Sequence, residues 1–379
     1  MEAFPYYKET SVTHRYVTHK MVEPILEKLP PVFKVERVGS SVRKNPIHMV
    51  TIGTGSKSIL MWSQMHGNES TTTKALLDMF KYLQRDDDSI RELLSNCTLY
   101  VIPILNPDGA TDYTRVNANE VDLNRDASML SQPESKVLRS VFEQVHPEFC
   151  FNLHDQRTIF GVGDSDLPAT VSFLAPAMDA KRTVDDERKR SMEVVAHMNS
   201  LLQGLIPGQI GRYDDTFNIN CVGDKFQSRG VPTILFESGH FPEDYSREET
   251  RKYIFQSLVS AVTYIAFNDV DGKHYRSYFD IPENQKTFND LLIKGYPIKK
   301  KRLDVIFQFK EVLDNNKITF DPICLKIGNL KNLKAHKTFN YSELSYKKEL
   351  SQTFSVNKSA LNLLKNFNEV NDWLIKISQ

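Results

Sequence analysis

The sequence predicts an α/β fold, with a central mixed, largely parallel sheet flanked by helices and a smaller β-rich domain after it. Three observations support this prediction. Short apolar runs alternate with segments of helical periodicity over the first 270 residues. The length of 379 residues suffices for one large domain and one small domain. Basic residues outnumber acidic residues beyond residue 270. We therefore expect a main domain at 1–270 and an accessory domain at 271–379.

Strands and helices alternate along the first domain. The apolar run at 59–65 is long enough for a buried strand, and the run after it has helical spacing. The expected strands are 33–38, 47–52, 59–65, 99–105, 149–153 and 233–236. The expected helices are 14–29, 70–84, 133–145, 187–202 and 247–267.

Residues 271–379 show fewer patterns that predict secondary structure. Segments 305–312 and 318–320 flank the turn sequence Asp314-Asn315-Asn316-Lys317, which is typical of a β-hairpin. Residues 323–327 are expected to add a strand, and 361–377 a terminal helix. We interpret the basic residues here, including the cluster 299–302, as a solvated surface rather than a site for an anionic partner.

Composition excludes several classes of protein. The formal net charge is zero, so no overall field favours nucleic acid or an anionic membrane. Charged residues interrupt every apolar run, and the first residues lack the pattern of a secretory signal. The four cysteines lie far apart, which favours free thiols in a reducing compartment. We expect a cytoplasmic protein; the sequence does not indicate its oligomeric state.

Polar side chains follow the ends of several predicted strands. His66 and Glu69 come after the third strand, Asn106 after the fourth, His154 after the fifth, and Glu237 ends the sixth. In open α/β sheets, ligands bind beyond the carboxyl ends of the strands. Two imidazoles and one carboxylate are a common catalytic zinc set that leaves a coordination position for water, and a further carboxylate can act as the base. The pattern therefore predicts a zinc hydrolase.

The motif H-x-x-E is weak evidence when it stands alone. The chain contains a second copy, His240 to Glu243, for which we expect no role in metal binding. The first copy, at His66 and Glu69, is favoured because it lies at a predicted strand-to-helix junction. The motifs that follow this copy in the sequence make it specific evidence for a zinc site.

These motifs, in order, resemble the zinc metallocarboxypeptidases of the carboxypeptidase A family. The resemblance covers about residues 45–265 and consists of His66-x-x-Glu69, Asn106-Pro107-Asp108-Gly109, Asp122-Leu123-Asn124-Arg125, Asn152-Leu153-His154 and Phe236-Glu237. It implies that one zinc ion per chain is bound by His66, Glu69 and His154.

The same resemblance implies roles for four further side chains. Glu237 would be the general base and then the general acid, and Arg115 would polarise the scissile carbonyl. Asn124 and Arg125 would bind the terminal carboxylate of the substrate, since a guanidinium can bind a carboxylate through two hydrogen bonds. The expected partner is thus a peptide with a free C-terminal carboxylate.

The chain departs from the family pattern at several positions. Asn68 stands where the family commonly has Arg, and Asp155-Gln156 stands where it usually has Ser-Tyr, so the outer subsites are in doubt. Tyr213 is the candidate for the family's mobile tyrosine, although no flanking motif fixes the alignment. The segment 222–224 falls where the family lines its side-chain pocket and indicates no preference.

Two alternatives remain open. The aspartoacylase and succinylglutamate desuccinylase group shares His-x-x-Glu zinc chemistry and hydrolyses N-acyl amino acids. The second alternative is a non-catalytic binding scaffold. Lost ligands or a lost base would favour a scaffold, but His66, Glu69, His154 and Glu237 are all present.

Overall fold

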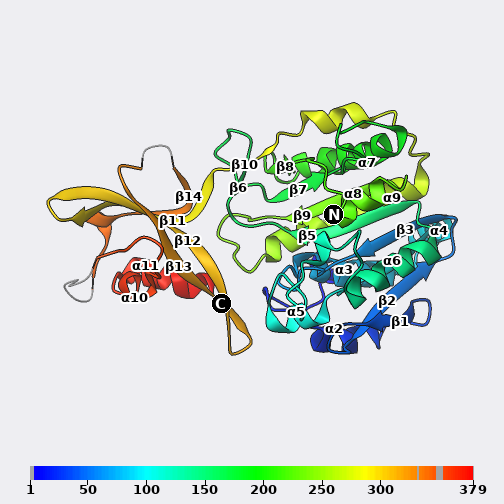
Figure 1. The fold of residues 1–379 in the computed structure, drawn as a ribbon, viewed down its shortest axis with the longest axis horizontal. Coiled ribbons are helices and arrows are strands. Elements are labelled where there is room, and N and C mark those ends of the chain that lie inside the picture. The colour runs from blue at the N-terminus through cyan, green and yellow to red at the C-terminus, as the bar shows by residue number, and fades with distance from the viewer. Residues whose placement is uncertain (1–3, 331–332, 347–352, 379) are drawn as a thin grey trace.

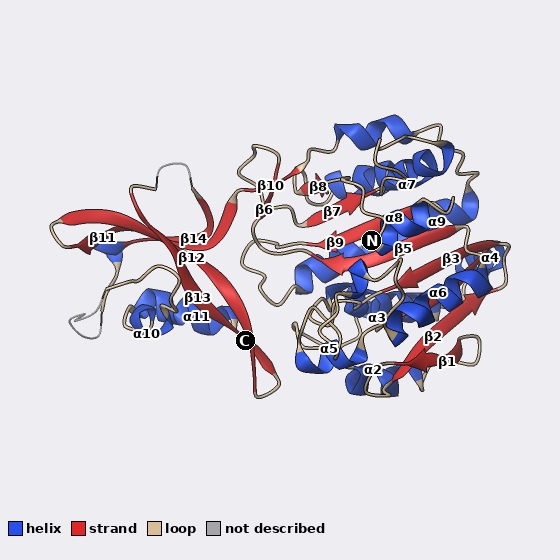
Figure 2. Cartoon of the chain, viewed as in Figure 1, coloured by secondary structure: helices blue, strands red, loops and turns tan. Residues whose placement is uncertain are grey.

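A computed structural model describes residues 4–330, 333–346 and 353–378. Figures 1 and 2 show a large body of helices around a sheet, and a smaller C-terminal part built on a second sheet. The predicted fold class is confirmed. The domain boundary at residue 270 stays a prediction.

The large body is organised around an eight-stranded sheet with the order β1-β2-β4-β3-β5-β9-β7-β8. Four of its seven pairings are parallel (β3 with β4, β3 with β5, β5 with β9, β7 with β8), and the other three are antiparallel. Its strands are β1 (Lys34–Ser40), β2 (Pro46–Gly53), β3 (Lys57–Trp62), β4 (Cys97–Ile102), β5 (Phe149–Asp155), β7 (Val171–Leu174), β8 (Ile210–Arg212) and β9 (Thr233–Ser238). A separate ribbon pairs β6 (Phe160–Val162) with β10 (Asn284–Lys286).

Helices cover both faces of this sheet, which explains the continuous apolar runs in its central strands. Successive side chains of a strand point to opposite faces. In β3, Ile59 and Met61 enter one apolar core, and Leu60 and Trp62 enter the other. The first core is covered by α2 (His19–Leu26), α3 (Thr71–Leu83), α4 (Asp88–Asn96), α7 (Asp186–Gln203) and α9 (Glu248–Phe267), and the second by α6 (Pro133–Val145) and α8 (Val222–Gln227). Short elements complete the body: α1 (Phe4–Tyr7), α5 (Pro107–Asp112), η1 (Leu123–Arg125) and η2 (Tyr275–Asp280).

The C-terminal sheet has four strands in the order β13-β12-β11-β14. They are β11 (Phe288–Ile298), β12 (Lys301–Asp314), β13 (Lys317–Gly328) and β14 (Lys334–Asn340), followed by η3 (Tyr341–Glu343), α10 (Leu361–Leu364) and α11 (Asn368–Ile377). The predicted hairpin is confirmed as β12–β13, and the strand expected at 323–327 is the continuation of β13. Asn315 and Asn316 both adopt positive φ (48° and 61°), the conformation that tight hairpin turns require and Asn tolerates.

Several predicted boundaries are wrong. The helix expected at 14–29 covers only His19–Leu26, and the helix expected at 361–377 is split into α10 and α11. The strand expected at 59–65 ends at Trp62. The turn expected at 106–109 instead begins α5, because the Asn106 side chain caps that helix by accepting from the Gly109 N–H (2.9 Å). The elements β7, β8, β11, β14, α4 and α8 were not predicted.

Glu248 begins α9 and is surrounded by three cations. Its Oε1 lies 2.5 Å from Lys74 Nζ, and its Oε2 lies 2.7 Å from Lys8 Nζ and 3.1 Å from Arg251 Nη1. Burial alone would raise the pKa of Glu248, but these cations lower it to about 2, from 4.5 in the absence of such contacts. A carboxyl group with a lowered pKa stabilises the folded chain above its unfolded pKa and loses this contribution as the pH falls through its folded pKa.

We therefore predict that Glu248→Gln lowers the free energy of unfolding at pH 7 by on the order of 2 kcal/mol. The deficit relative to the unmodified chain should shrink as the pH is lowered from about 5 toward 3. Urea unfolding over this pH range measures both effects. The matched control is Glu249→Gln, because Glu249 is the next residue and forms only an exposed ion pair with Lys252 (2.9 Å). Equal destabilisation by the two substitutions would contradict the prediction.

Candidate active site

The loop that carries His66 and Glu69 connects β3 to α3 and packs against the start of α5. A Cβ on Gly67 would lie 1.9 Å from the Gly109 carbonyl carbon, so only glycine fits there. The Asn106 side-chain amide donates to the Met65 carbonyl (3.1 Å). These contacts explain why the His-x-x-Glu motif and the Asn-Pro-Asp-Gly motif occur together: the second motif holds the first in place.

His154 and Glu237 lie at the ends of two neighbouring parallel strands. His154 on β5 pairs in register with Glu237 on β9, so their side chains leave the sheet on the same side. Both residues are at least nine-tenths buried. The structure therefore brings the two predicted strand-end residues next to each other.

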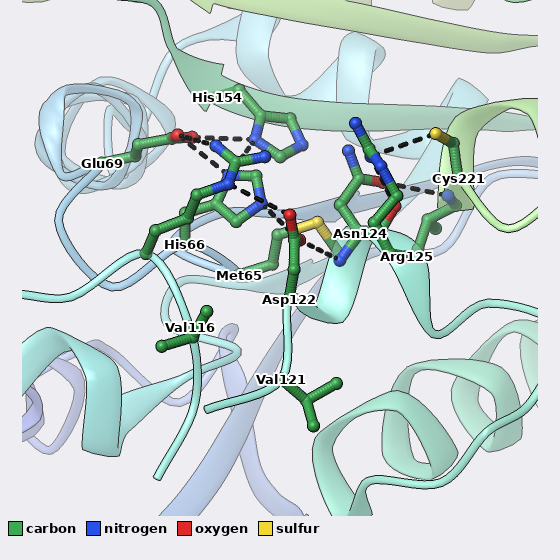
Figure 3. Close-up of polar contacts among 12 residues, drawn as sticks. Met65, His66, Glu69, Val116, Val121, Asp122, Asn124, Arg125, His154 and Cys221 are labelled. Atoms are coloured by element: carbon green, nitrogen blue, oxygen red, sulfur yellow. Dashed lines mark hydrogen bonds and ion pairs between the residues drawn. The ribbon is translucent and has the colours of Figure 1, made fainter. Parts of the chain in front are cut away.

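The three predicted metal ligands converge on one point (Figure 3). His66 Nδ1 lies 2.9 Å from Glu69 Oε1, His154 Nδ1 lies 2.8 Å from Glu69 Oε2, and the two Nδ1 atoms lie 3.1 Å apart. Ligand atoms around a tetrahedral zinc ion with bonds of about 2.0–2.1 Å lie about 3.3 Å from one another. The observed separations come close to this value, and a buried set of two imidazoles and one carboxylate is a zinc donor set. These residues fit a zinc ion.

Asp122 orients His66 and is a functional residue for which the sequence predicted no role. Its Oδ1 lies 3.0 Å from His66 Nε2, and its Oδ2 accepts from Arg115 Nε (3.0 Å). Burial opposes ionisation, but His66 and Arg115 hold the pKa of Asp122 well below its usual value. Such a carboxylate fixes the tautomer and the ring orientation of a metal-binding histidine. The sequence signal that could have identified Asp122 is its position as the first residue of the Asp122-Leu123-Asn124-Arg125 motif.

Arg115 lies at the edge of this centre. Besides its contact with Asp122, its Nη1 lies 3.3 Å from Glu69 Oε1, and its side chain is about half exposed (48%). The guanidinium is thus held beside the converging ligands and is accessible from solvent. This location suits the predicted role.

Asn124 and Arg125 lie together on the 3-10 helix η1. The Asn124 side-chain oxygen accepts from the Val222 N–H (3.0 Å), and Arg125 Nη1 donates to its neighbour's carbonyl (2.8 Å) and to Cys221 Sγ (3.1 Å) (Figure 3). The exposed Arg125 forms no ion pair with a carboxylate of the described residues. The pair therefore leaves a charged donor available for an anionic ligand.

Glu237 is buried, and nearby charges only partly offset the cost of ionising it. Its Oε2 has no hydrogen-bond partner among the described residues. Burial, followed by the negative charges of Glu69 and Asp155, raises the pKa of Glu237 well above its usual value. A carboxyl group with a raised pKa can both take and return a proton near neutral pH.

A cavity of about 430 Å³ brings these residues together. Glu237, Arg115, Arg125 and the three metal-ligand candidates all line it. Tyr213, which follows β8, also lines it, and burial and the charges of Glu237 and Glu69 raise the pKa of the Tyr213 hydroxyl. Every residue proposed from the sequence for this site, Asn124 included, therefore faces one cavity; their individual roles stay predictions.

The second H-x-x-E copy does not form a site. His240 is buried against the rings of Tyr245 and His336, whereas Glu243 lies at the surface near Lys337 (3.3 Å). One further group in the described part of the chain could hold a metal: His19, Glu23 and His48, on α2 and β2. It does not line the cavity.

All four cysteines are free thiols, as predicted from their spacing. In the described residues, no helix has the length and apolar character required to cross a membrane.

Comparisons with known proteins agree with this arrangement. Residues 18–159 match the family model described as zinc carboxypeptidase, which confirms the resemblance noted from the sequence. Among curated proteins, carboxypeptidase SOL1 of Arabidopsis thaliana is 24% identical over 166 residues, which cover 38% of this chain and 34% of that protein. Carboxypeptidase 2 of Trichophyton rubrum is 26% identical over 102 residues, which cover 26% of this chain and 19% of that protein. This chain thus matches about a third of the length of the first relative and about a fifth of the second.

Solved structures share the fold. A metallo-carboxypeptidase from Burkholderia cenocepacia has a TM-score of 0.52 and 18% identity, covering 66% of this chain and 69% of its own. The carboxypeptidase A from Helicoverpa armigera also has a TM-score of 0.52, with 15% identity, covering 70% of this chain and 78% of its own. At these identities the likeness establishes the carboxypeptidase fold.

Proposed function

We propose that this chain, whose residues 18–159 match the zinc carboxypeptidase family, is a zinc-dependent carboxypeptidase that releases the C-terminal residue of peptides. One observation supports the proposal: a single cavity contains a zinc donor set, a buried carboxylate beside it and an arginine that forms no ion pair with any residue that the structure describes. These are the parts required to bind a terminal carboxylate and hydrolyse the amide bond next to it.

Each side chain contributes through its own chemistry. Arg125 and the Asn124 amide bind the terminal carboxylate and thereby place the scissile carbonyl beside His66, Glu69 and His154. A zinc ion held by these three residues would supply Lewis acidity and lower the pKa of a water molecule. Glu237 accepts the proton of the attacking water and later returns it to the leaving amine.

Arg115 stabilises the negative charge that develops on the carbonyl oxygen. A fixed cation contributes most when it is positioned before the reaction, and Arg115 is held in position by Asp122. Tyr213, whose hydroxyl is protonated at neutral pH as in an ordinary tyrosine, lines the same cavity and can donate a hydrogen bond there.

The space around the site favours peptides over single N-acyl amino acids. Beyond Glu69 and Arg115 the cavity adjoins a second one of about 300 Å³. A substrate that ends in a short acyl group would leave this second cavity empty. We therefore place the carboxypeptidase reaction ahead of the deacylase reaction.

Arg125→Ala tests the recognition of the terminal carboxylate. The lost hydrogen bond to a charged group should cost about 1.5–3 kcal/mol, which lowers kcat/KM for a free-acid peptide at least about tenfold. The matching C-terminal amide should be a poor substrate of the unmodified enzyme and lose little further activity in the variant. Arg229→Ala is a control, because Arg229 pairs with Glu143 (3.4 Å) outside the cavity.

Mass spectrometry of a digested hexapeptide separates the two reactions. A carboxypeptidase releases one residue from the C-terminus. An intact hexapeptide together with rapid hydrolysis of an N-acyl amino acid would replace the proposal with the deacylase reaction.

A further inference from the structure

A second cavity of about 300 Å³ adjoins the catalytic cavity and has one wall made by the C-terminal sheet. The two cavities share five lining residues: Glu69, Arg115, Asp155, Gln156 and Arg157. The hairpin β12–β13 contributes four residues to the second cavity alone: Gln308, Phe309, Glu311 and Phe320. The cavities therefore meet along the edge of the metal centre, and one of them ends on the C-terminal sheet.

The direction of a bound peptide follows from this arrangement, given the proposed function. Arg125 and Asn124 line only the first cavity, whereas Glu69 lines both. A peptide with its terminal carboxylate at Arg125 and its last amide bond at the metal centre has its C-terminal residue in the first cavity. The residues that precede the scissile bond must then leave past Glu69 and Arg115, where the second cavity begins.

The hairpin wall is held in place by contacts with the catalytic body. Glu311 Oε1 lies 3.0 Å from Arg15 Nη1, and its Oε2 accepts from the Tyr113 hydroxyl (2.5 Å). The buried Asp290 accepts from the Phe309 N–H (2.7 Å) and from the Tyr245 hydroxyl (2.9 Å). Buried and partly buried polar contacts of this kind fix the position of the segments that they join.

The positions at which the sequence departs from the family pattern also line this second cavity. Asn68, Asp155 and Gln156 are all part of its lining. However, Asp155 Oδ2 accepts from the N–H (3.1 Å) and the hydroxyl (2.6 Å) of Thr71 at the start of α3, and the Gln156 amide donates to the Ala169 carbonyl (2.7 Å). The Gln156 amide and one carboxylate oxygen of Asp155 are thus occupied by structural contacts, and the hairpin supplies four further residues of the lining.

Arg157 provides the free charge at the junction. Arg15 is paired with Glu311, and Arg115 is paired with Glu69 and Asp122. Arg157 is exposed, lines both cavities and forms no ion pair within the part of the chain that the structure describes. A cation in this position attracts a carboxylate that enters with the substrate.

We propose that the hairpin β12–β13 and Arg157 form an outer subsite that binds the peptide residues preceding the scissile bond and favours an acidic side chain among them. The C-terminal sheet is then part of the substrate cleft. This outer subsite accounts for the location of the second cavity, which contains both the departures from the family pattern and Arg157.

Steady-state kinetics on the full-length zinc enzyme test this proposal. The substrates are an N-acetyl dipeptide and two N-acetyl tetrapeptides that end in the same dipeptide and carry either Glu or Gln before it. For the unmodified enzyme, kcat/KM should be about tenfold higher for the tetrapeptides than for the dipeptide, because the added residues contact Phe309 and Phe320 in the second cavity. The Glu peptide should exceed the Gln peptide by about two- to fivefold, the range for a partly exposed ion pair.

Two variants separate the contribution of the hairpin from the charge preference that Arg157 provides. Phe309→Ala should reduce the ratio of the Gln tetrapeptide to the dipeptide to near one and keep the preference for Glu over Gln, and Arg157→Gln should abolish that preference. Phe309→Leu keeps an apolar side chain in the aromatic cluster with Tyr245 and should reduce the ratio less. Lys310→Gln is the control, because Lys310 is the exposed next residue on β12 and does not line the cavity.

The outcomes are distinguishable from failure of the proposed function. An enzyme that hydrolyses all three peptides, with the same ratios in Phe309→Ala, Arg157→Gln and Lys310→Gln, would overturn the outer subsite and leave the carboxypeptidase proposal standing. An enzyme that hydrolyses none of the peptides would overturn both.

Discussion

Replacing Glu237 by Gln should reduce kcat by roughly 10²–10⁴, while the fold and zinc binding persist. The amide has the shape of the carboxyl group but cannot accept the proton of the attacking water. In the structure, Glu237 is buried beside the metal-ligand candidates, and its Oε2 has no partner among the described residues. No structural contact of this oxygen is lost on substitution, so the loss should be confined to the reaction.

Single-turnover kinetics, zinc analysis and thermal unfolding of the same preparation separate chemistry from metal content and stability. Glu243→Gln is the matched control, because Glu243 belongs to the other H-x-x-E copy and lies at the surface. Unchanged turnover in a folded, zinc-containing Glu237→Gln enzyme would show that the base lies elsewhere.

The site could be predicted from the sequence because it is built at the ends of buried strands. His154 and Glu237 each follow an apolar run, and parallel strands that are adjacent in a sheet bring their carboxyl ends to one edge. The His66 loop follows the same rule at β3. Local pattern and sheet topology agree at these positions, so the placement of these residues at the strand ends followed from the sequence, and their roles stay predictions.

Other features depend on contacts that no local pattern encodes. Strands β7 and β8 have only four and three residues, too few for a periodic signal. Strand β14 is only partly buried and pairs in parallel with β11, with the hairpin between them in the sequence. Its pairing partner therefore could not be inferred from the neighbouring residues.

The contact between the hairpin β12–β13 and the catalytic body is the clearest feature that no local sequence pattern encodes. Arg15 and Glu311, which join the N-terminal segment to the C-terminal sheet, lie 296 positions apart in the sequence. A lone Arg in a loop and a lone Glu in an exposed strand have no motif that links them. Only the folded chain shows that residues beyond 270 line the second cavity.

Removing His154 should abolish both zinc binding and activity. His66, Glu69 and His154 form a set with the separations of a tetrahedral site, and two of the three cannot hold zinc tightly. The unmodified protein should contain about one equivalent of tightly bound zinc, and His154→Ala should lose most of it. Because metal that binds only the folded state stabilises it by about 2.7 kcal/mol at one hundred times its Kd, chelation should also lower the Tm.

The chain contains its own control for this experiment. His19, Glu23 and His48 are the other group with ligand atoms close enough for a metal within the described residues, and they lie outside the cavity. His48→Ala should therefore keep the tightly bound zinc, the activity and the fall of Tm on chelation, all of which His154→Ala should lose. Stoichiometric zinc in a protein that carries both His66→Ala and His154→Ala would place the metal elsewhere, and a loss of zinc in His48→Ala would place it at the second group.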